Sequence, residues 1–190
     1  MTGRPADNPF ASRRIDRLTY RVPEGGLRFV VERLRRAGGR GAVVGAHGSG
    51  KTTLLEALAD RLDGRPVRLA LNAETARPLE FAIASLPETI GSERTILIDG
   101  AEQLGRWGWW RLARRVKDAG IVVITSHTPG RLPTIHECLT SPQLLAELVD
   151  ELAPGMSEVI DLDELHRRHE GNIRLCFREL YDRWARREAG

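Results

Sequence analysis

The stretch that decides the fold of this chain is Gly45-Ala46-His47-Gly48-Ser49-Gly50-Lys51-Thr52. Its fixed positions follow the spacing G-x-x-x-x-G-K-[ST]. A short apolar run, residues 42–44, precedes the stretch, and the leucines of residues 51–62 recur after it at helical spacing. The pattern therefore predicts a buried strand, a glycine-rich turn and the first turn of a helix in direct succession.

This succession is typical of a loop that binds phosphate groups. Glycines let the backbone curl so that its N–H groups point at phosphate oxygens, and the start of a helix adds partial positive charge. The Lys51 ammonium would then reach the β and γ phosphates, and the Thr52 hydroxyl would bind Mg²⁺. Only Lys51 and Lys117 are lysines among the 29 basic residues, which indicates a chemical role for Lys51. The competing interpretation is a glycine-rich turn that merely precedes a helix. The expected nucleotide-binding residues are Gly45, His47, Gly48, Ser49, Gly50, Lys51, Thr52 and Thr53.

Apolar strands alternate with helices along the middle of the chain. Such alternation predicts an α/β protein, a three-layer sandwich with a mostly parallel five-stranded sheet whose ligands sit beyond the carboxyl ends of the strands. The expected strands are residues 42–44, 67–71, 95–98, 121–125 and 157–162. The expected helices are residues 27–34, 51–62, 79–86, 102–119, 142–152, 163–170 and 173–187.

The length of 190 residues and the hydrophobic content of 41% suit one domain with its own core. We expect an irregular N-terminal leader over residues 1–25 and a core over residues 26–162. A short helical segment, residues 163–190, is expected to pack on that core. The two cysteines, Cys138 and Cys176, show no metal-binding or disulfide spacing, and no long apolar segment is present, so we expect a cytoplasmic protein that does not contact membranes.

A carboxylate follows the expected strand of residues 95–98. Asp99 at this point has the arrangement called Walker B, in which a buried strand delivers one acid that holds Mg²⁺ through water. Together with the glycine-rich loop, and with a strand and helix between the two motifs, the chain resembles the additional-strand branch of P-loop NTPases. That branch includes AAA+ ATPases, RecA-like proteins and ABC ATPases. The resemblance implies ATP and Mg²⁺ as cofactors.

The same resemblance implies roles for two further residues. It places strand 121–125 between the other two motif-bearing strands, with Thr125 near the γ-phosphate like the polar sensor 1 of AAA+ proteins. The alternative is that Thr125 bonds its own backbone at the strand end. The run Gly171-Asn172-Ile173-Arg174 resembles the start of the sensor 2 helix, with Arg174 as the phosphate contact. The alternative is an ordinary helix start with a solvated arginine.

The chain departs from this family at the position after Asp99. AAA+ ATPases usually carry a glutamate there to polarise the attacking water, and here the residue is Gly100. Glu102 is the nearest carboxylate; it either orients water or caps the following helix. Glu74 is the reserve candidate. The missing base predicts slow hydrolysis, with the bound nucleotide acting as a switch for a protein or nucleic-acid partner.

Two other functions fit the same motifs. One is a P-loop kinase for small molecules or nucleotides; Arg131 lies in a suitable loop, but no clustered lid arginines accompany it. The other is a regulator that binds ATP without turnover. GTP is not expected because no Asn-Lys-x-Asp motif follows any strand.

A tryptophan- and arginine-rich segment spans residues 107–115. It combines rings that can stack on bases with guanidinium groups that can bind phosphates. A protein-binding surface and simple packing are the alternatives, and the sequence indicates no oligomeric state. The residues concerned are Arg106, Trp107, Trp109, Trp110, Arg111, Arg114 and Arg115.

Overall fold

The computed structural model describes residues 8–22, 25–62, 66–74 and 77–188. The chain forms two compact units. The first, here called the sheet unit, comprises Tyr20–Gly45 and Gly50–Cys138, and the second, the helical unit, comprises Met1–Thr19, Ala46–Ser49 and Leu139–Gly190. Residues 1–7 and 23–24 of the predicted leader lie outside the described residues. The predicted divisions after residues 25 and 162, and the packing of residues 163–190 on the core, remain predictions.

The sheet unit contains five strands: β1 (Arg40–Gly45), β2 (Val67–Ala70), β3 (Thr95–Asp99), β4 (Ile121–Ser126) and β5 (Thr134–Cys138). They lie in the order β2-β3-β4-β1-β5, and every neighbouring pair is parallel. The predicted place of the fourth strand, between the strand that precedes the loop and the strand that ends at Asp99, is therefore confirmed. All carboxyl ends of these strands lie at one edge of the sheet.

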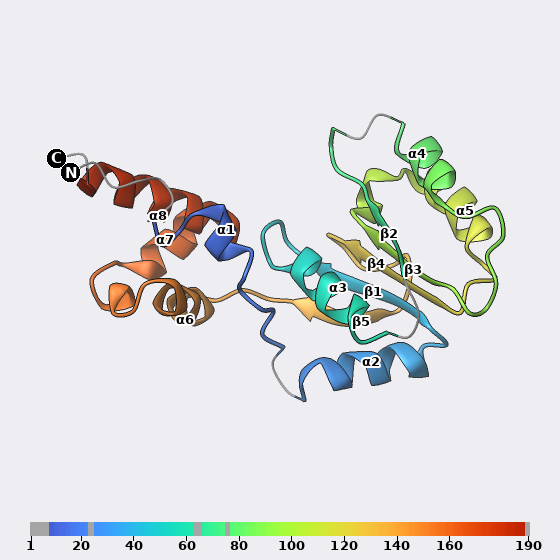
Figure 1. Ribbon diagram of the computed structural model, residues 1–190, viewed down its shortest axis with the longest axis horizontal. Coiled ribbons are helices and arrows are strands. Elements are labelled where there is room, and N and C mark those ends of the chain that lie inside the picture. The colour runs from blue at the N-terminus through green and yellow to red at the C-terminus, as the bar shows by residue number, and fades with distance from the viewer. Residues whose placement is uncertain (1–7, 23–24, 63–65, 75–76, 189–190) are drawn as a thin grey trace. The chain divides into compact units, whose positions relative to one another are not determined.

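Helices cover both faces of this sheet (Figure 1). Alternate side chains of a strand point to opposite faces. Accordingly, Ile96 and Ile98 pack in one buried cluster with α4 (Pro78–Ser85) and α5 (Arg106–Arg115). Leu97 packs in the other, with α2 (Gly26–Arg36) and α3 (Lys51–Ala59). These two clusters on a central sheet make a three-layer α/β fold, as the sequence predicts.

The predicted strand over residues 157–162 is wrong. That stretch contains a 3₁₀ turn, Met156–Glu158, and then the start of α7 (Leu162–Arg168). The Asp161 side chain caps this helix by accepting a hydrogen bond of 2.9 Å from the Glu164 backbone N–H. An N-cap ends the extended run because its oxygen satisfies a free amide at the helix start. The fifth strand is β5 instead, beside β1.

The predicted helix over residues 102–119 is also wrong in its extent. A 3₁₀ turn, Ala101–Gln103, comes first, and α5 begins only at Arg106 and ends at Arg115. Leu104 and Gly105 separate the two, with Leu104 buried in the core. Glu102 therefore lies in a short turn directly after β3, and not in the first turn of a long helix.

The helical unit has its own buried core. Its helices are α1 (Ser12–Ile15), α6 (Pro142–Leu152), α7 and α8 (Ile173–Glu188). Ser141 accepts a hydrogen bond of 3.1 Å from the Leu144 N–H and caps α6, whose bounds are those of the helix that the sequence predicts over residues 142–152. Phe10, from the predicted irregular leader, is buried and lies against Phe177 and Trp184 of α8. Among the described residues, no helix combines the length and the apolar character needed to cross a membrane.

Candidate functional site

Three sequence-predicted residues converge at the carboxyl end of β3. Asp99 is the last residue of that strand, and one of its carboxylate oxygens, Oδ2, accepts a hydrogen bond of 2.8 Å from the Thr52 hydroxyl of α3. The other, Oδ1, accepts a bond of 2.5 Å from the Thr125 hydroxyl of β4. The order β3-β4-β1, with α3 following β1, brings these elements together at one edge of the sheet. Asp99 is thus fixed in place by hydroxyls from two different elements.

Thr125 bonds the neighbouring strand end, and not its own backbone. Besides donating to Asp99, its hydroxyl oxygen accepts a hydrogen bond of 2.8 Å from the Gly100 N–H. The residue is completely buried. Because a threonine hydroxyl has only one proton, this bonding makes Thr125 a residue that orients Asp99. Its predicted contact with a γ-phosphate remains a prediction.

Lys51 is the first residue of α3 and is buried. Its ammonium donates a hydrogen bond of 2.8 Å to the Gly45 carbonyl, at the end of β1. Burial lowers the pKa of Lys51 below its ordinary value, although nearby Glu102 and Asp99 act to raise it. A buried cation of this kind is stabilised by a further anion, because desolvation is its dominant cost.

The start of α3 requires glycine at its N-cap. Gly50 has a φ of +89°, and a Cβ added there would lie 2.9 Å from the Tyr20 ring. Tyr20 in turn hydrogen bonds His136 of β5, with 2.9 Å between the hydroxyl and Nε2. Both the backbone conformation and this close approach exclude larger residues. Sequence reasoning missed Tyr20 and His136, whose aromatic and polar side chains carry no motif spacing.

The loop residues Ala46–Ser49 belong to the helical unit. Gly48 has a φ of +71°, and the Ser49 hydroxyl donates a hydrogen bond of 2.9 Å to the Ala46 carbonyl. A Cβ added at Gly48 would meet the Asn172 side chain, which precedes α8 in the same unit. The loop therefore adopts a curled conformation that depends on glycine, as its pattern predicts.

Gly100 occupies a position that has no room for a side chain. Its φ is +78°, and a Cβ at this position would lie 1.9 Å from the Leu71 carbonyl oxygen. No side chain fits here, because its backbone conformation would be strained and its Cβ would overlap a backbone oxygen. The chain therefore excludes every larger residue, glutamate included, from the position after Asp99.

Glu102 stands two residues further on, within the 3₁₀ turn. Its Oε1 lies 3.1 Å from His127 Nε2, just beyond the end of β4. Its Oε2 is buried and has no hydrogen-bond partner within the described residues. No side chain caps the 3₁₀ turn or α5, so the capping alternative for Glu102 has no support in this structure. The unpartnered oxygen is an acceptor of the kind that holds a water molecule.

Arg131 also borders this carboxylate. Its guanidinium donates to the Leu104 carbonyl and lies over the Trp109 ring, 5.5 Å from the ring centre. Burial lowers the pKa of Arg131, and the charge of Glu102 opposes that effect. Sequence reasoning named Arg131 only for the kinase alternative and missed His127; the signal for His127 is its place directly after a strand end.

Four predicted residues remain. Arg174 lies in the first turn of α8 in the helical unit and is exposed. Glu74 is exposed after β2, with its backbone N–H bonded to the Asn72 side chain at 3.0 Å. His47 is exposed, and Thr53 is half-buried on α3. Their predicted roles remain predictions.

The residues that the sequence predicts for Mg²⁺ fit an ion that keeps most of its water. Thr52 and Asp99 present two neighbouring oxygens, and the Glu102 oxygen without a partner lies in the turn that follows Asp99. Within the described ranges, no group of three or more His, Cys, Asp or Glu side chains is able to hold a metal. Mg²⁺ usually takes one or two protein oxygens and completes its shell with phosphates and water. Thr52 and Asp99 therefore supply as many protein oxygens as this ion usually takes.

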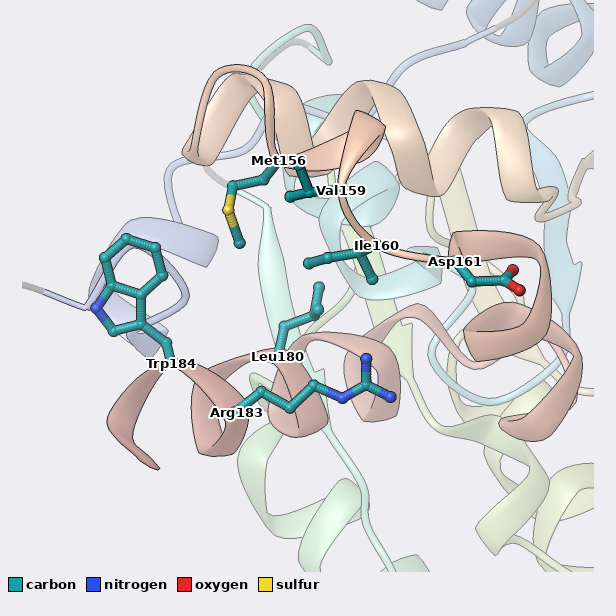
Figure 2. A pocket seen from close by; sticks show the side chains of 7 residues that line it. All are labelled: Met156, Val159, Ile160, Asp161, Leu180, Arg183 and Trp184. Carbon is teal, nitrogen blue, oxygen red and sulfur yellow. The ribbon is translucent and has the colours of Figure 1, made fainter. Parts of the chain in front are cut away.

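A separate cavity of about 120 Å³ lies in the helical unit. Its lining residues include the apolar Met156, Ile160 and Leu180, and Asp161 points away from them toward the start of α7 (Figure 2). Arg183 at its edge is paired with Glu179. The cavity holds no residue of the predicted site and offers no reactive group.

No protein-family model matches this chain, and no curated protein sequence matches it.

Proposed function

We propose that this protein binds Mg-ATP and hydrolyses it slowly, acting as a nucleotide-dependent switch. The observation that carries the proposal is the contact of 2.8 Å between the Thr52 hydroxyl and the Asp99 carboxylate. It joins the last residue of the glycine-rich pattern to the acid at the end of β3. These two oxygens would bind Mg²⁺, and the loop amides and Lys51 would bind the phosphates.

The electrostatics of the cluster support an anionic ligand. Lys51 is buried and its pKa is lowered, so its charged form gains from a triphosphate nearby. The positive φ of Gly48 and Gly50 supports a loop whose amides point at that ligand.

Slow turnover follows from the position of Glu102, which lies in the turn after Asp99. Gly100 leaves no room for a glutamate directly after Asp99, and Glu102 is engaged on one side by His127. In the proposal, the unpartnered Glu102 oxygen accepts a proton from the attacking water.

The two free, buried cysteines suit a reducing compartment, and we place the protein in the cytoplasm.

Calorimetric titration with Mg-ATP and Mg-GTP tests this proposal. We expect the wild type to bind Mg-ATP and Lys51→Ala to lose at least about tenfold in affinity, because a charge-assisted phosphate contact is lost. The matched control is Lys117→Ala, which removes the only other lysine, an exposed one, and should bind as the wild type does. Absence of nucleotide binding by the wild type, or equal binding by Lys51→Ala, would overturn the proposal.

A further inference from the structure

The exposed side of α5 has an unusual composition. Its exposed side chains are three arginines and two tryptophans, Arg106, Trp107, Trp110, Arg111 and Arg114, and the helix contains no acidic residue. Trp107 is 78% exposed and Trp110 is 52% exposed. Large rings this exposed do not stabilise the core of the sheet unit, because burial is what stabilises them.

The rings and guanidinium groups on this surface are ordered against one another. Trp107 and Trp110 meet edge to face, with 5.8 Å between ring centres. The Arg114 guanidinium lies over the Trp110 ring at 5.1 Å. Each tryptophan is therefore held by its neighbours while part of it stays open to a partner.

We propose that this side of α5, here called the Arg-Trp face, binds single-stranded nucleic acid. Nucleobases stack on tryptophan rings whatever the sequence, and arginines bind the phosphates between them. The charge of the Arg-Trp face favours a nucleic acid over a protein as its partner. The face offers three guanidinium groups and no carboxylate, which complements a continuous polyanion. DNA and RNA single strands share this chemistry. The inference does not rest on the nucleotide site, because it involves none of that site's residues.

The test is a titration of tryptophan fluorescence with oligo-dT and oligo-U of twenty nucleotides, without ATP. We expect quenching by at least one of them, and a slope of about −2 for log affinity against log salt concentration if all three arginines bind phosphates. Trp107→Ala should weaken binding by at least about fivefold, the lower bound for loss of one stacked base. Trp107→Phe should recover most of that loss, because the ring is retained.

Phe29→Ala is the matched control. Phe29 is another exposed aromatic residue with an arginine over its ring, Arg33 at 5.9 Å, but it lies on α2. The Phe29→Ala variant should bind both oligonucleotides as the wild type does. The Lys51→Ala variant should do the same, because Lys51 is not part of the Arg-Trp face. This second control distinguishes failure of the nucleotide site from failure of the present inference. Heparin serves as a polyanion without bases. No binding of either oligonucleotide, equal loss in Phe29→Ala, or equal loss of heparin and oligonucleotide binding in Trp107→Ala would overturn the proposal.

Discussion

Glu102 is the residue on which the proposed chemistry depends most. One of its oxygens is paired with His127, and the other is buried without a partner in the described part of the chain. If that oxygen accepts the proton of the attacking water, Glu102→Gln should lower the single-turnover rate of phosphate release by about 10²- to 10⁴-fold. Its affinity for Mg-ATP should change by less than about threefold, because the carboxylate does not bind the phosphates.

The control for this prediction is Glu88→Gln, an exposed carboxylate after α4 that should leave both quantities unchanged. Phosphate release by Glu102→Gln at the wild-type rate would show that the carboxylate is not the base. Release by the wild type at several per second without any partner would contradict slow turnover itself.

The end of β3 allows only a narrow range of backbone conformations. Gly100 has a positive φ, and a Cβ there would meet the Leu71 carbonyl. Gly100→Glu would introduce the glutamate that AAA+ ATPases have at this position. We nevertheless expect it to lower the free energy of unfolding by at least about 2 kcal/mol and not to speed hydrolysis, because the backbone must shift to admit any side chain.

Urea denaturation and phosphate release measure the two effects. Gly105→Ala is the matched control, since a Cβ at Gly105 meets nothing within 4 Å and its φ is −59°. It should change the free energy of unfolding by less than about 1 kcal/mol. A Gly100→Glu variant that is as stable as the wild type and hydrolyses ATP faster would refute the argument from sterics.

Some strands of the sheet can be predicted from the sequence and others cannot. β1, β3 and β4 are buried on both faces, so their apolar runs stand out, and the strand order follows from the motif spacing through the family resemblance. β5 escaped notice because it lies at the edge of the sheet and its sequence, TIHEC, contains no apolar run and has two accessible residues in succession, His136 and Glu137. The strand predicted over residues 157–162 is wrong because the apolar pair Val159 and Ile160 is also typical of a strand. In the structure, Asp161 and Glu164 form the N-cap of a helix there.

The sequence also predicts some residues of the candidate site and misses others. The sequence identified Lys51, Thr52 and Asp99 through their spacing, and the structure joins Thr52 to Asp99. It did not identify His127, because the place of that residue after a strand end does not show which side chain it contacts. Such contacts arise from the order of strands in the sheet, which brings distant segments together only after folding.

At the scale of the whole molecule, the two units have separate buried cores. In the helical unit, Phe10 packs against Phe177, with ring centres 6.3 Å apart, and against Trp184 at 6.5 Å. Phe10→Ala should therefore lower the free energy of unfolding of this unit by about 3 to 5 kcal/mol, the usual cost of removing a buried phenylalanine. Near-ultraviolet circular dichroism during urea denaturation would follow the loss of packing around Trp184.

Val159→Ala is the control, because Val159 is 66% exposed in the same unit and its truncation should cost less than about 1 kcal/mol. Equal stability of the Phe10→Ala variant and the wild type would mean that residues 8–19 add nothing to the helical unit.

Phe10 can pack only after the ribosome has synthesised the residues of α8. The Asn8 side chain donates a hydrogen bond to the Tyr181 carbonyl, a residue 173 positions later in the chain. A ribosome adds roughly 5 to 20 residues per second, so the early segment waits roughly 9 to 35 seconds for its partners. During that interval the nascent sheet unit already has all its strands, while Phe10 still offers an apolar ring to chaperones.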